Sequence, residues 1–219
     1  LAGGRGTRLP QSARDIPKAL VEIHGKTILD HQLELLAKHG LTDIRLALGF
    51  WADRIIAHIK DKGLDNVEYV IEPEPLGTGG GVRFASKGLK EDFMVLNGDT
   101  MSDFNLSEIL QRHEPGAPLI VSAWRDDARD FGLLGIVSGK IQAFLEKPET
   151  PRPGFINAGC YILHPKHFED VKEKEFMLEK DVFPRLAEEG ELRTHVHLGF
   201  WQDVGTEDRL SEVRSKKPQ

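Results

Sequence analysis

The stretch that decides the fold reads L-A-G-G-R-G-T-R-L from Leu1 to Leu9 and is followed by I-P-K-A-L from Ile16 to Leu20. Three glycines within four positions let the backbone take positive φ values and approach a ligand closely. Successive N–H groups in such a loop form an anion-binding concavity. Arg8 and Lys18 add two positive charges nearby. The pattern predicts a polyphosphate site, and the alternative is a glycine-rich surface turn with incidental basic residues.

Two familiar phosphate motifs are excluded. The segment from Gly4 to Leu9 ends in leucine where a dinucleotide fingerprint needs its third glycine. No G-x-x-x-x-G-K-[ST] sequence occurs anywhere in the chain. A phosphate site in this loop would therefore have another arrangement than these two motifs.

Composition limits the classes of protein to consider. The 219 residues suffice for one substantial domain with a proper core. A net charge of −6 argues against a nucleic-acid-binding surface, and no apolar run reaches the 18 residues typical of a membrane span. The single cysteine, Cys160, cannot form an internal disulfide, which fits a reducing cytoplasm.

Strand and helix patterns alternate along the first half of the chain. This rhythm predicts βαβ units and an α/β fold with a mainly parallel sheet. We expect helices over 27–39, 52–62, 82–89, 106–112, 176–189 and 207–215, and strands over 44–48, 67–71, 93–96, 119–124, 135–137, 141–146, 155–163, 192–197 and 200–201.

A second glycine-rich segment, from Glu72 to Gly81, follows the expected strand 67–71. In an open α/β sheet, ligands bind outside the carboxyl ends of the strands, so this loop should lie at the ligand edge. A plain turn would not need four glycines in five positions. Glu72 then either meets the ligand or is a solvated acid at a strand end.

Asp99 comes shortly after the apolar run from Phe93 to Leu96, within N-G-D-T. A carboxylate at the end of a buried strand is costly unless it is paired or bound to a cation. Beside a triphosphate loop, oxygen ligands of this kind suit a hard divalent metal. The alternative is an aspartate that only caps a turn.

Several motifs together resemble the sugar-1-phosphate nucleotidyltransferases, also called nucleotide-sugar pyrophosphorylases. They are L-A-G-G-x-G-T-R-L with P-K-x-L, then L-G-T-G-G at 76–80, G-D at 98–99, E-K-P at 146–148, N-A-G at 157–159 and W-Q-D-V-G-T at 201–206. The resemblance implies a Rossmann-like, mostly parallel mixed sheet flanked by helices. It implies one nucleotidyltransferase domain over 1–219, with a nucleotide-binding part at about 1–105 and a sugar-phosphate-binding part at about 106–219. In this family a strand precedes the first loop, and we expect that strand to lie ahead of Leu1.

The resemblance also implies site residues. The nucleotide would contact Leu1, Ala2, Gly3, Gly4, Gly6, Thr7, Arg8, Lys18, Glu72, Gly77, Thr78, Asn97 and Gly98. The sugar phosphate would contact Gly135, Glu146, Lys147, Asn157 and Glu179. Asp99 and Asp203 would hold Mg²⁺. Arg8 would steady the leaving pyrophosphate, Lys18 the triphosphate and Lys147 the attacking phosphate, so that Arg8, Lys18, Asp99 and Lys147 form the catalytic set.

The implied reaction joins a nucleoside triphosphate to a sugar 1-phosphate and releases pyrophosphate. An ionised Glu72 accepts hydrogen bonds only, and guanine offers it two adjacent donors, which favours GTP. The chain is most similar to guanylyltransferases for D-glycero-D-manno-heptose 1-phosphate or mannose 1-phosphate, whose products serve lipopolysaccharide or capsule synthesis. The alternatives are a uridylyl- or thymidylyltransferase for glucose or N-acetylmuramate 1-phosphate, and a non-catalytic nucleotide-sugar-binding subunit. We expect a cytoplasmic homodimer.

Overall fold

The computed structural model describes residues 1–4 and 16–215. These residues form two compact units, each built from separate stretches of the chain. The first unit contains Leu1–Pro75, Asn97–Leu106 and the segment from Gly199, and the second contains Leu76–Leu96 and Ser107–Leu198. Among the described residues, no helix has the length and apolar character that crossing a bilayer requires.

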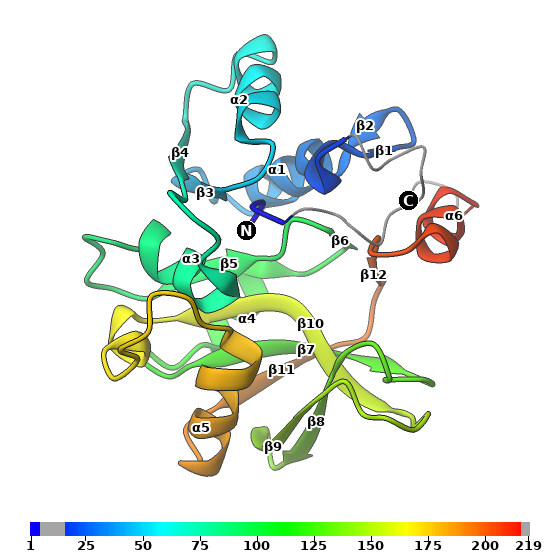
Figure 1. Ribbon diagram of the computed structural model, residues 1–219. Helices are drawn as coiled ribbons and strands as arrows, with labels where there is room; N and C mark the ends of the chain where they lie inside the picture. The colour runs from blue at the N-terminus through cyan, green and yellow to red at the C-terminus, as the bar shows by residue number, and fades with distance from the viewer. Residues whose placement is uncertain (5–15, 216–219) are drawn as a thin grey trace. The chain divides into compact units, whose positions relative to one another are not determined.

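A parallel strand pair forms the centre of the first unit. The chain runs through α1 (Ile28–Lys38), β3 (Ile44–Leu48), α2 (Ala52–Asp61) and β4 (Val67–Ile71), and the crossover from β3 to β4 passes through α2 (Figure 1). Ala2 forms a parallel bridge with Leu48, and its N–H donates to the carbonyl of Ala47 at 2.8 Å. The residues just before the first glycine therefore run beside β3.

A second ladder in the first unit joins distant parts of the chain. β6 (Thr100–Ser102) pairs antiparallel with β12 (Trp201–Asp203), and α6 (Glu207–Ser215) follows β12. The short elements η2 (Lys18–Leu20), β1 (Glu22–Ile23) and β2 (Lys26–Thr27) precede α1. A hydrophobic cluster ties these pieces together, and its buried members are Val21, Ile23, Ile28, Val204, Leu210 and Val213.

The second unit is built around a six-stranded sheet in the order β5-β10-β7-β11-β9-β8, in which β8 also pairs with β10. Figure 1 shows β10, β7 and β11 side by side. Its strands are β5 (Phe93–Leu96), β7 (Leu119–Arg125), β8 (Gly132–Val137), β9 (Lys140–Glu146), β10 (Gly154–Leu163) and β11 (Arg193–His197). Its helices are α3 (Gly77–Ala85), α4 (Leu106–Arg112, whose first residue belongs to the first unit), η3 (Pro165–Phe168), the π-helical turn η4 (Leu178–Val182) and α5 (Phe183–Glu188).

The expected α/β fold, with mixed sheets flanked by helices, is confirmed. Parallel pairing joins β3 to β4 and β7 to β11, whereas the other pairs of the six-stranded sheet are antiparallel. The sheet is therefore less parallel than expected. The reason is that β7 to β10 follow one another without an intervening helix, and short connections such as the turn between β8 and β9 join antiparallel strands.

Two helix boundaries differ from the sequence prediction. α3 begins at Gly77 and not at residue 82, so the second glycine-rich segment is partly helical. The helix expected over 176–189 is divided into the turn η4 and the α-helix α5. Pro184 has no N–H to donate and suits only the first turn of an α-helix, so regular α-helix starts at Phe183.

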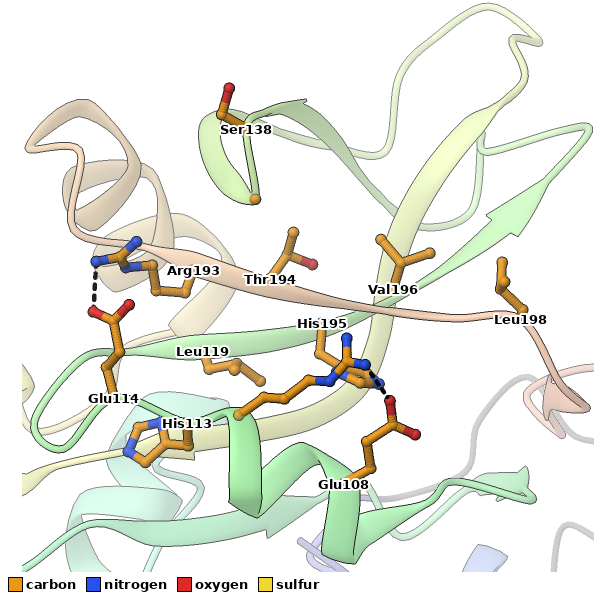
Figure 2. A pocket seen from close by; sticks show the side chains of 12 residues that line it. Glu108, His113, Glu114, Leu119, Ser138, Arg193, Thr194, His195, Val196 and Leu198 are labelled. Atoms are coloured by element: carbon orange, nitrogen blue, oxygen red, sulfur yellow. Dashed lines mark hydrogen bonds and ion pairs between the residues drawn. The ribbon is translucent and has the colours of Figure 1, made fainter.

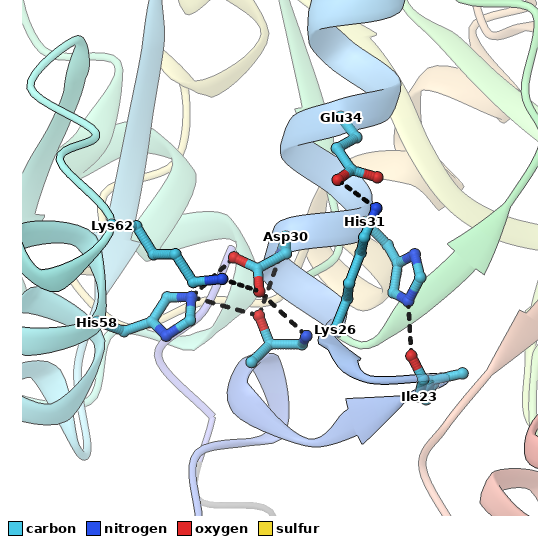
Figure 3. Close-up of polar contacts among 8 residues, drawn as sticks. Ile23, Lys26, Asp30, His31, Glu34, His58 and Lys62 are labelled. Carbon is cyan, nitrogen blue, oxygen red and sulfur yellow. Dashed lines mark hydrogen bonds and ion pairs between the residues drawn. The ribbon is translucent and has the colours of Figure 1, made fainter.

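Asp30 fastens the start of α1 to the end of α2 (Figure 3). Its carboxylate accepts from His58 Nε2 at 2.8 Å and from the Thr27 N–H at 3.2 Å, and Lys62 Nζ lies 3.5 Å away. The Thr27 hydroxyl accepts in turn from the Asp30 N–H at 3.1 Å, which completes a capping box. Burial disfavours the charged carboxyl, but the hydrogen bonds from His58 and Thr27 outweigh burial and lower the pKa of Asp30.

We predict that Asp30→Asn lowers the free energy of unfolding by about 1–3 kcal/mol at pH 7, because hydrogen bonds to a charged group are lost. The folded pKa is depressed, so the stabilisation is present above the unfolded pKa and disappears as pH falls through the folded value. Urea unfolding at a series of pH values measures this. Asp61→Asn, at an exposed site on α2, is the control and should lower the free energy of unfolding much less. If the difference in the free energy of unfolding between wild type and Asp30→Asn stayed constant down to pH 2, the depressed pKa of Asp30 would be contradicted.

Candidate functional site

The first group of predicted site residues lies at the carboxyl ends of β3 and β4 in the first unit. Gly3 and Glu72 are close together, because a Cβ built on Gly3 would lie 3.2 Å from Glu72 Oε1. The N–H of Gly98 donates to the carbonyl of Leu1 at 2.8 Å. The first loop and the N-G-D-T segment therefore meet, as the resemblance implies. Gly6, Thr7 and Arg8 lie outside the described residues.

Lys18 and Asp99 form an ion pair. Lys18 Nζ lies 2.9 Å from Asp99 Oδ2, and the two side chains are 16% and 30% exposed. Lys18 belongs to η2, which follows the Pro17 of the P-K-A-L motif. Asn97 lies just before this site, and its carbonyl accepts from Gln32 Nε2 at 2.7 Å. Helix α1 therefore supports the segment that carries Asp99.

Asp203 is brought to Asp99 by the ladder of β6 and β12. Asp203 is opposite Thr100, and the Val204 N–H donates to the Asp99 carbonyl at 2.9 Å. Its Oδ2 accepts from the Arg209 guanidinium at 3.0 Å and from the Gly205 N–H at 3.2 Å. Burial raises the pKa of Asp203, and the nearby Asp99 raises it further, although Arg209 opposes both effects.

The two aspartates fit a hard divalent cation. Asp203 Oδ1 is buried and has no hydrogen-bond partner among the residues that the structure describes. A buried carboxylate oxygen of this kind, beside a second carboxylate, is stabilised by a cation. No cluster of three or more histidine, cysteine or acidic side chains suitable for a metal occurs in 1–4 and 16–215. Two carboxylates without a full protein cage suit an ion that takes its remaining ligands from water and substrate phosphates, as Mg²⁺ does.

A second group of predicted residues lies in the second unit, around the start of α3. The Thr78 hydroxyl donates to Glu179 Oε2 at 2.6 Å and accepts from the Leu178 N–H at 3.0 Å. Sequence reasoning placed Thr78 with the nucleotide and Glu179 with the sugar. The structure joins them directly.

The glycines at the start of α3 are required by packing. Gly77 has φ +73°, and the N–H groups of Gly79 and Gly80 donate to the Phe176 carbonyl at 2.9 and 3.2 Å. A Cβ on Gly77 would overlap the Phe176 carbonyl, and a Cβ on Gly79 would overlap its ring. These N–H groups at the helix start are thus bonded within the unit, and packing requires glycine at Gly77 and Gly79. The nucleotide contact of Gly77 and Thr78 stays a prediction.

β9 ends at Glu146, which forms an ion pair at 3.1 Å with Lys147, the residue that follows the strand. Lys147 has φ +49°, a left-handed conformation that is uncommon outside glycine, and its N–H donates to the Phe131 carbonyl at 3.0 Å. Gly132 is opposite Glu146, whereas the predicted Gly135 is opposite Ala143, nearer the hairpin turn. Gly135 is therefore not brought to the E-K-P segment. The residue that sequence reasoning missed is Gly132, which shares the F-G-L-L-G segment with it.

Asn157 lies at an irregular point of β10, where the pairing with β7 shifts register. Its Nδ2 donates to the Tyr161 hydroxyl at 3.0 Å, and its Oδ1 accepts from the Gly159 N–H at 2.9 Å. Both ends of the amide have partners within the strand. The structure thus gives Asn157 a structural role, and the sugar contact stays a prediction.

A pocket of about 530 Å³ is found elsewhere in the second unit (Figure 2). Arg112 pairs there with Glu108 at 2.9 Å, and Arg193 pairs with Glu114 at 2.6 Å. None of the predicted site residues lines this pocket, whose walls are Glu108, Arg112, His113, Glu114, Leu119, Ser138, Gly139, Arg193, Thr194, His195, Val196 and Leu198. Its charged side chains largely neutralise one another.

Arg209 is the other residue that sequence reasoning missed. Arg209 lies in the first turn of α6 and forms an ion pair with Asp203. The side chain of Arg209 is 17% exposed and that of Asp203 is 16% exposed. An arginine shortly after D-V-G-T was a visible signal. Its partner could not be read from the motif, because the contact depends on how α6 follows β12.

We predict that Gly98→Ala lowers the free energy of unfolding by about 1–3 kcal/mol, because its Cβ would overlap the Leu1 carbonyl, which is backbone and cannot turn away. Gly4→Ala is the matched control, since no atom of the described residues lies within 4 Å of a Cβ there. Thermal and urea unfolding of the two variants measure the difference. Equal losses in the free energy of unfolding for the two variants would show that Gly98 does not pack against Leu1 as described.

Comparison with known proteins identifies the family. The family model described as nucleotidyl transferase matches residues 1–219. Mannose-1-phosphate guanyltransferase 2 of Candida glabrata is 36% identical over 217 residues, which cover 94% of this chain and 60% of that protein. Mannose-1-phosphate guanyltransferase of Saccharomyces cerevisiae is 35% identical, with 94% and 60% covered. The chain thus spans about three fifths of the length of these curated relatives.

Solved structures agree with the sequence match. The crystal structure of HddC from Yersinia pseudotuberculosis is 33% identical, has a TM-score of 0.85, and the match covers 97% of this chain and 95% of that one. A second structure of HddC, complexed with GMP-PN, is equally similar. The ladder of β6 and β12 brings Asp203 to Asp99, and Lys18 forms an ion pair with Asp99. Because the family model also matches residues 1–219, this chain belongs to the nucleotidyl transferase family.

Proposed function

We propose that this protein transfers a nucleotidyl group from a nucleoside triphosphate to a sugar 1-phosphate, giving a nucleotide sugar and pyrophosphate. The observation that carries the proposal is the pair of carboxylates, Asp99 and Asp203, joined by the ladder of β6 and β12 with Lys18 bonded to one of them. Membership of the nucleotidyl transferase family supports it. The alternative of a non-catalytic subunit has no support from these residues, because Lys18, Asp99, Lys147 and Asp203 are all present.

The reaction needs alignment and charge neutralisation, and it needs no covalent enzyme intermediate. A phosphate oxygen of the sugar 1-phosphate attacks the α-phosphorus, and the bond from that phosphorus to the bridging oxygen of pyrophosphate breaks. Lys18 binds the triphosphate and Lys147 holds the attacking phosphate. Asp99 and Asp203 hold Mg²⁺, which when bound neutralises phosphoryl oxygens and aligns the two reacting groups. Arg8, which lies outside the described residues, completes the proposed catalytic set.

We favour GTP and a manno-configured sugar 1-phosphate as substrates. Glu72, close to the backbone of Gly3, presents a carboxylate that can accept both adjacent donors of guanine. Two relatives are named mannose-1-phosphate guanyltransferases, and HddC has been solved with GMP-PN. D-glycero-D-manno-heptose 1-phosphate is also a manno-configured sugar 1-phosphate. A homodimer in the cytoplasm, serving cell-surface glycan synthesis, stays a prediction.

We predict that Asp99→Ala lowers Mg²⁺-dependent release of pyrophosphate by roughly 10²–10³-fold, since one well-placed electrostatic group is removed. A coupled pyrophosphate assay measures turnover, and circular dichroism confirms that the variant folds. Asp65→Ala removes an exposed carboxylate and should leave turnover unchanged. If Asp99→Ala keeps more than about a tenth of wild-type turnover, the metal assignment is wrong.

We predict that GTP with mannose or heptose 1-phosphate gives the highest kcat/KM in a matrix of substrates. The matrix combines GTP, UTP, dTTP, CTP and ATP with heptose, mannose, glucose, N-acetylglucosamine and N-acetylmuramate 1-phosphates. Glu72→Gln should reduce the preference for GTP, because an amide presents one acceptor and one donor where the carboxylate presents two acceptors. A strong preference for UTP or dTTP, with GTP inert, would overturn the guanine argument and leave the reaction class standing.

A further inference from the structure

Gln32 binds both ends of the short turn that carries Asp99. Its Nε2 donates to the Asn97 carbonyl at 2.7 Å and to the Thr100 carbonyl at 2.9 Å. A side-chain amide nitrogen has two N–H donors, and a backbone carbonyl can only accept, so the two partners together decide which end of the amide faces the turn. Gln32 therefore uses both of its donors on the backbone that flanks Asp99.

The turn has the hydrogen bond of a β-turn, with Asp99 at its third position. The Thr100 N–H donates to the Asn97 carbonyl at 3.3 Å. The Asp99 carbonyl in turn accepts from the Val204 N–H at 2.9 Å. Val204 thus holds the middle of the turn, and Gln32 holds its two ends.

Helix α1 gives Gln32 a fixed base. Gln32 lies in the second turn of this helix, and the helix packs against β6. In the first turn, Ile28 belongs to the buried cluster that also contains Val204. The next residue, Leu29, belongs to a second buried cluster together with Leu48 of β3. A side chain on a helix anchored in two clusters can hold the turn at a defined position.

The same amide relates the two aspartates to each other. Thr100, which accepts from Gln32, is the first residue of β6 and is opposite Asp203 on β12. A neutral amide also suits this place, because Lys18 Nζ already lies 2.9 Å from Asp99 Oδ2. A charged donor at the position of Gln32 would add a second cation beside that carboxylate, whereas the amide holds the backbone without competing for it.

We propose that Gln32 is a positioning residue for the reaction: it holds both ends of the turn from Asn97 to Thr100 and so places the Asp99 carboxylate where, with Asp203, it binds the divalent cation. The inference rests on the proposed function and adds a residue to its site. Gln32 acts through the backbone and has no assigned contact with substrate or cation. A displacement of a reacting group by about 1 Å costs on the order of 10²-fold in rate, so a small movement of this turn is sufficient to matter.

Two substitutions at Gln32 test the role. Gln32→Met removes both donors at a similar side-chain length, and Gln32→Glu turns an acceptor-only carboxylate toward two carbonyls. Each variant should lower kcat by roughly 10–100-fold and raise the Mg²⁺ concentration for half-maximal turnover by about tenfold, as the loss of a group that orients a metal ligand does. At saturating Mg²⁺, KM for GTP and for mannose 1-phosphate should stay nearly unchanged, because no substrate contact is removed.

Asp30→Asn is the control for stability, because Asp30 lies on the same helix and bonds to Thr27 and His58, away from the turn. It is expected to lower the free energy of unfolding and to leave the Mg²⁺ requirement unchanged. Gln111→Met, at an exposed site on α4, controls for the type of substitution. If Asp30→Asn shifts the Mg²⁺ requirement as much as Gln32→Met does, or if Gln32→Met does not shift it, the proposal is overturned.

Direct binding of a cation separates this inference from the reaction itself. Mn²⁺ also takes oxygen ligands, and its binding to the protein without substrates is followed by electron paramagnetic resonance. Wild-type protein and Gln111→Met should bind Mn²⁺ about tenfold more tightly than Gln32→Met does. If wild-type protein releases no pyrophosphate but shows this difference, the proposed reaction fails and the positioning role stands. If Gln32→Met binds Mn²⁺ as tightly as wild type, or if wild type binds none, the positioning role is overturned whatever the turnover assay shows.

Discussion

The pairing of β6 with β12 is the constraint on which the first unit depends. These two short strands come from stretches far apart in the sequence, and their ladder joins the N-G-D-T segment to the W-Q-D-V-G-T segment. The backbone bond from Val204 to the Asp99 carbonyl sets the separation of the two aspartates before any ligand is present. Placing two carboxylates together opposes folding unless cations compensate, and Lys18 and Arg209 supply that compensation.

Lys18 and Arg209 have different roles in the proposed reaction. Lys18 bonds to Asp99 at a site that is still 30% exposed on the acid side, so substrate phosphates can compete for the lysine. Arg209 bonds one oxygen of Asp203, and the other, Oδ1, is buried with no partner in the described part of the chain. The arginine therefore orients the carboxylate while the lysine is available to the nucleotide. This arrangement gives the site a preformed acidic face without a cage of protein ligands.

Sequence reasoning succeeded where periodicity is strong. The helix α1, the strands β3 and β4 and the hairpin of β8 and β9 agree with it within a few residues, because apolar spacing and turn residues determine them locally. It misplaced the start of α3, which begins at Gly77 within the glycine-rich segment. Gly77 and Gly79 are crowded there by Phe176, a residue almost a hundred positions later, whose approach the sequence does not display.

The candidate site was predictable in part for a related reason. Asp99 and Asp203 stand in motifs, and the ladder of β6 and β12 brings those two motifs together. Gly132 was missed because only strand register decides which glycine of β8 is opposite Glu146. The bond from Thr78 to Glu179 was missed because it joins two motifs that were assigned to different ligands. Contacts of this kind depend on tertiary packing, which a single sequence does not display.

The division of the chain into two units places the predicted site residues in two separately packed cores. Asp99, Asp203 and Lys18 are held by the core of the first unit, whereas Glu146, Lys147 and Glu179 are held by the sheet and helices of the second. Substitutions that reshape the strands β8 and β9 or the turn η4 act on packing that the aspartate ladder does not share. A substitution within the packing of the second unit therefore acts first on Glu146, Lys147 and Glu179, whereas one in the ladder of β6 and β12 acts first on the two aspartates.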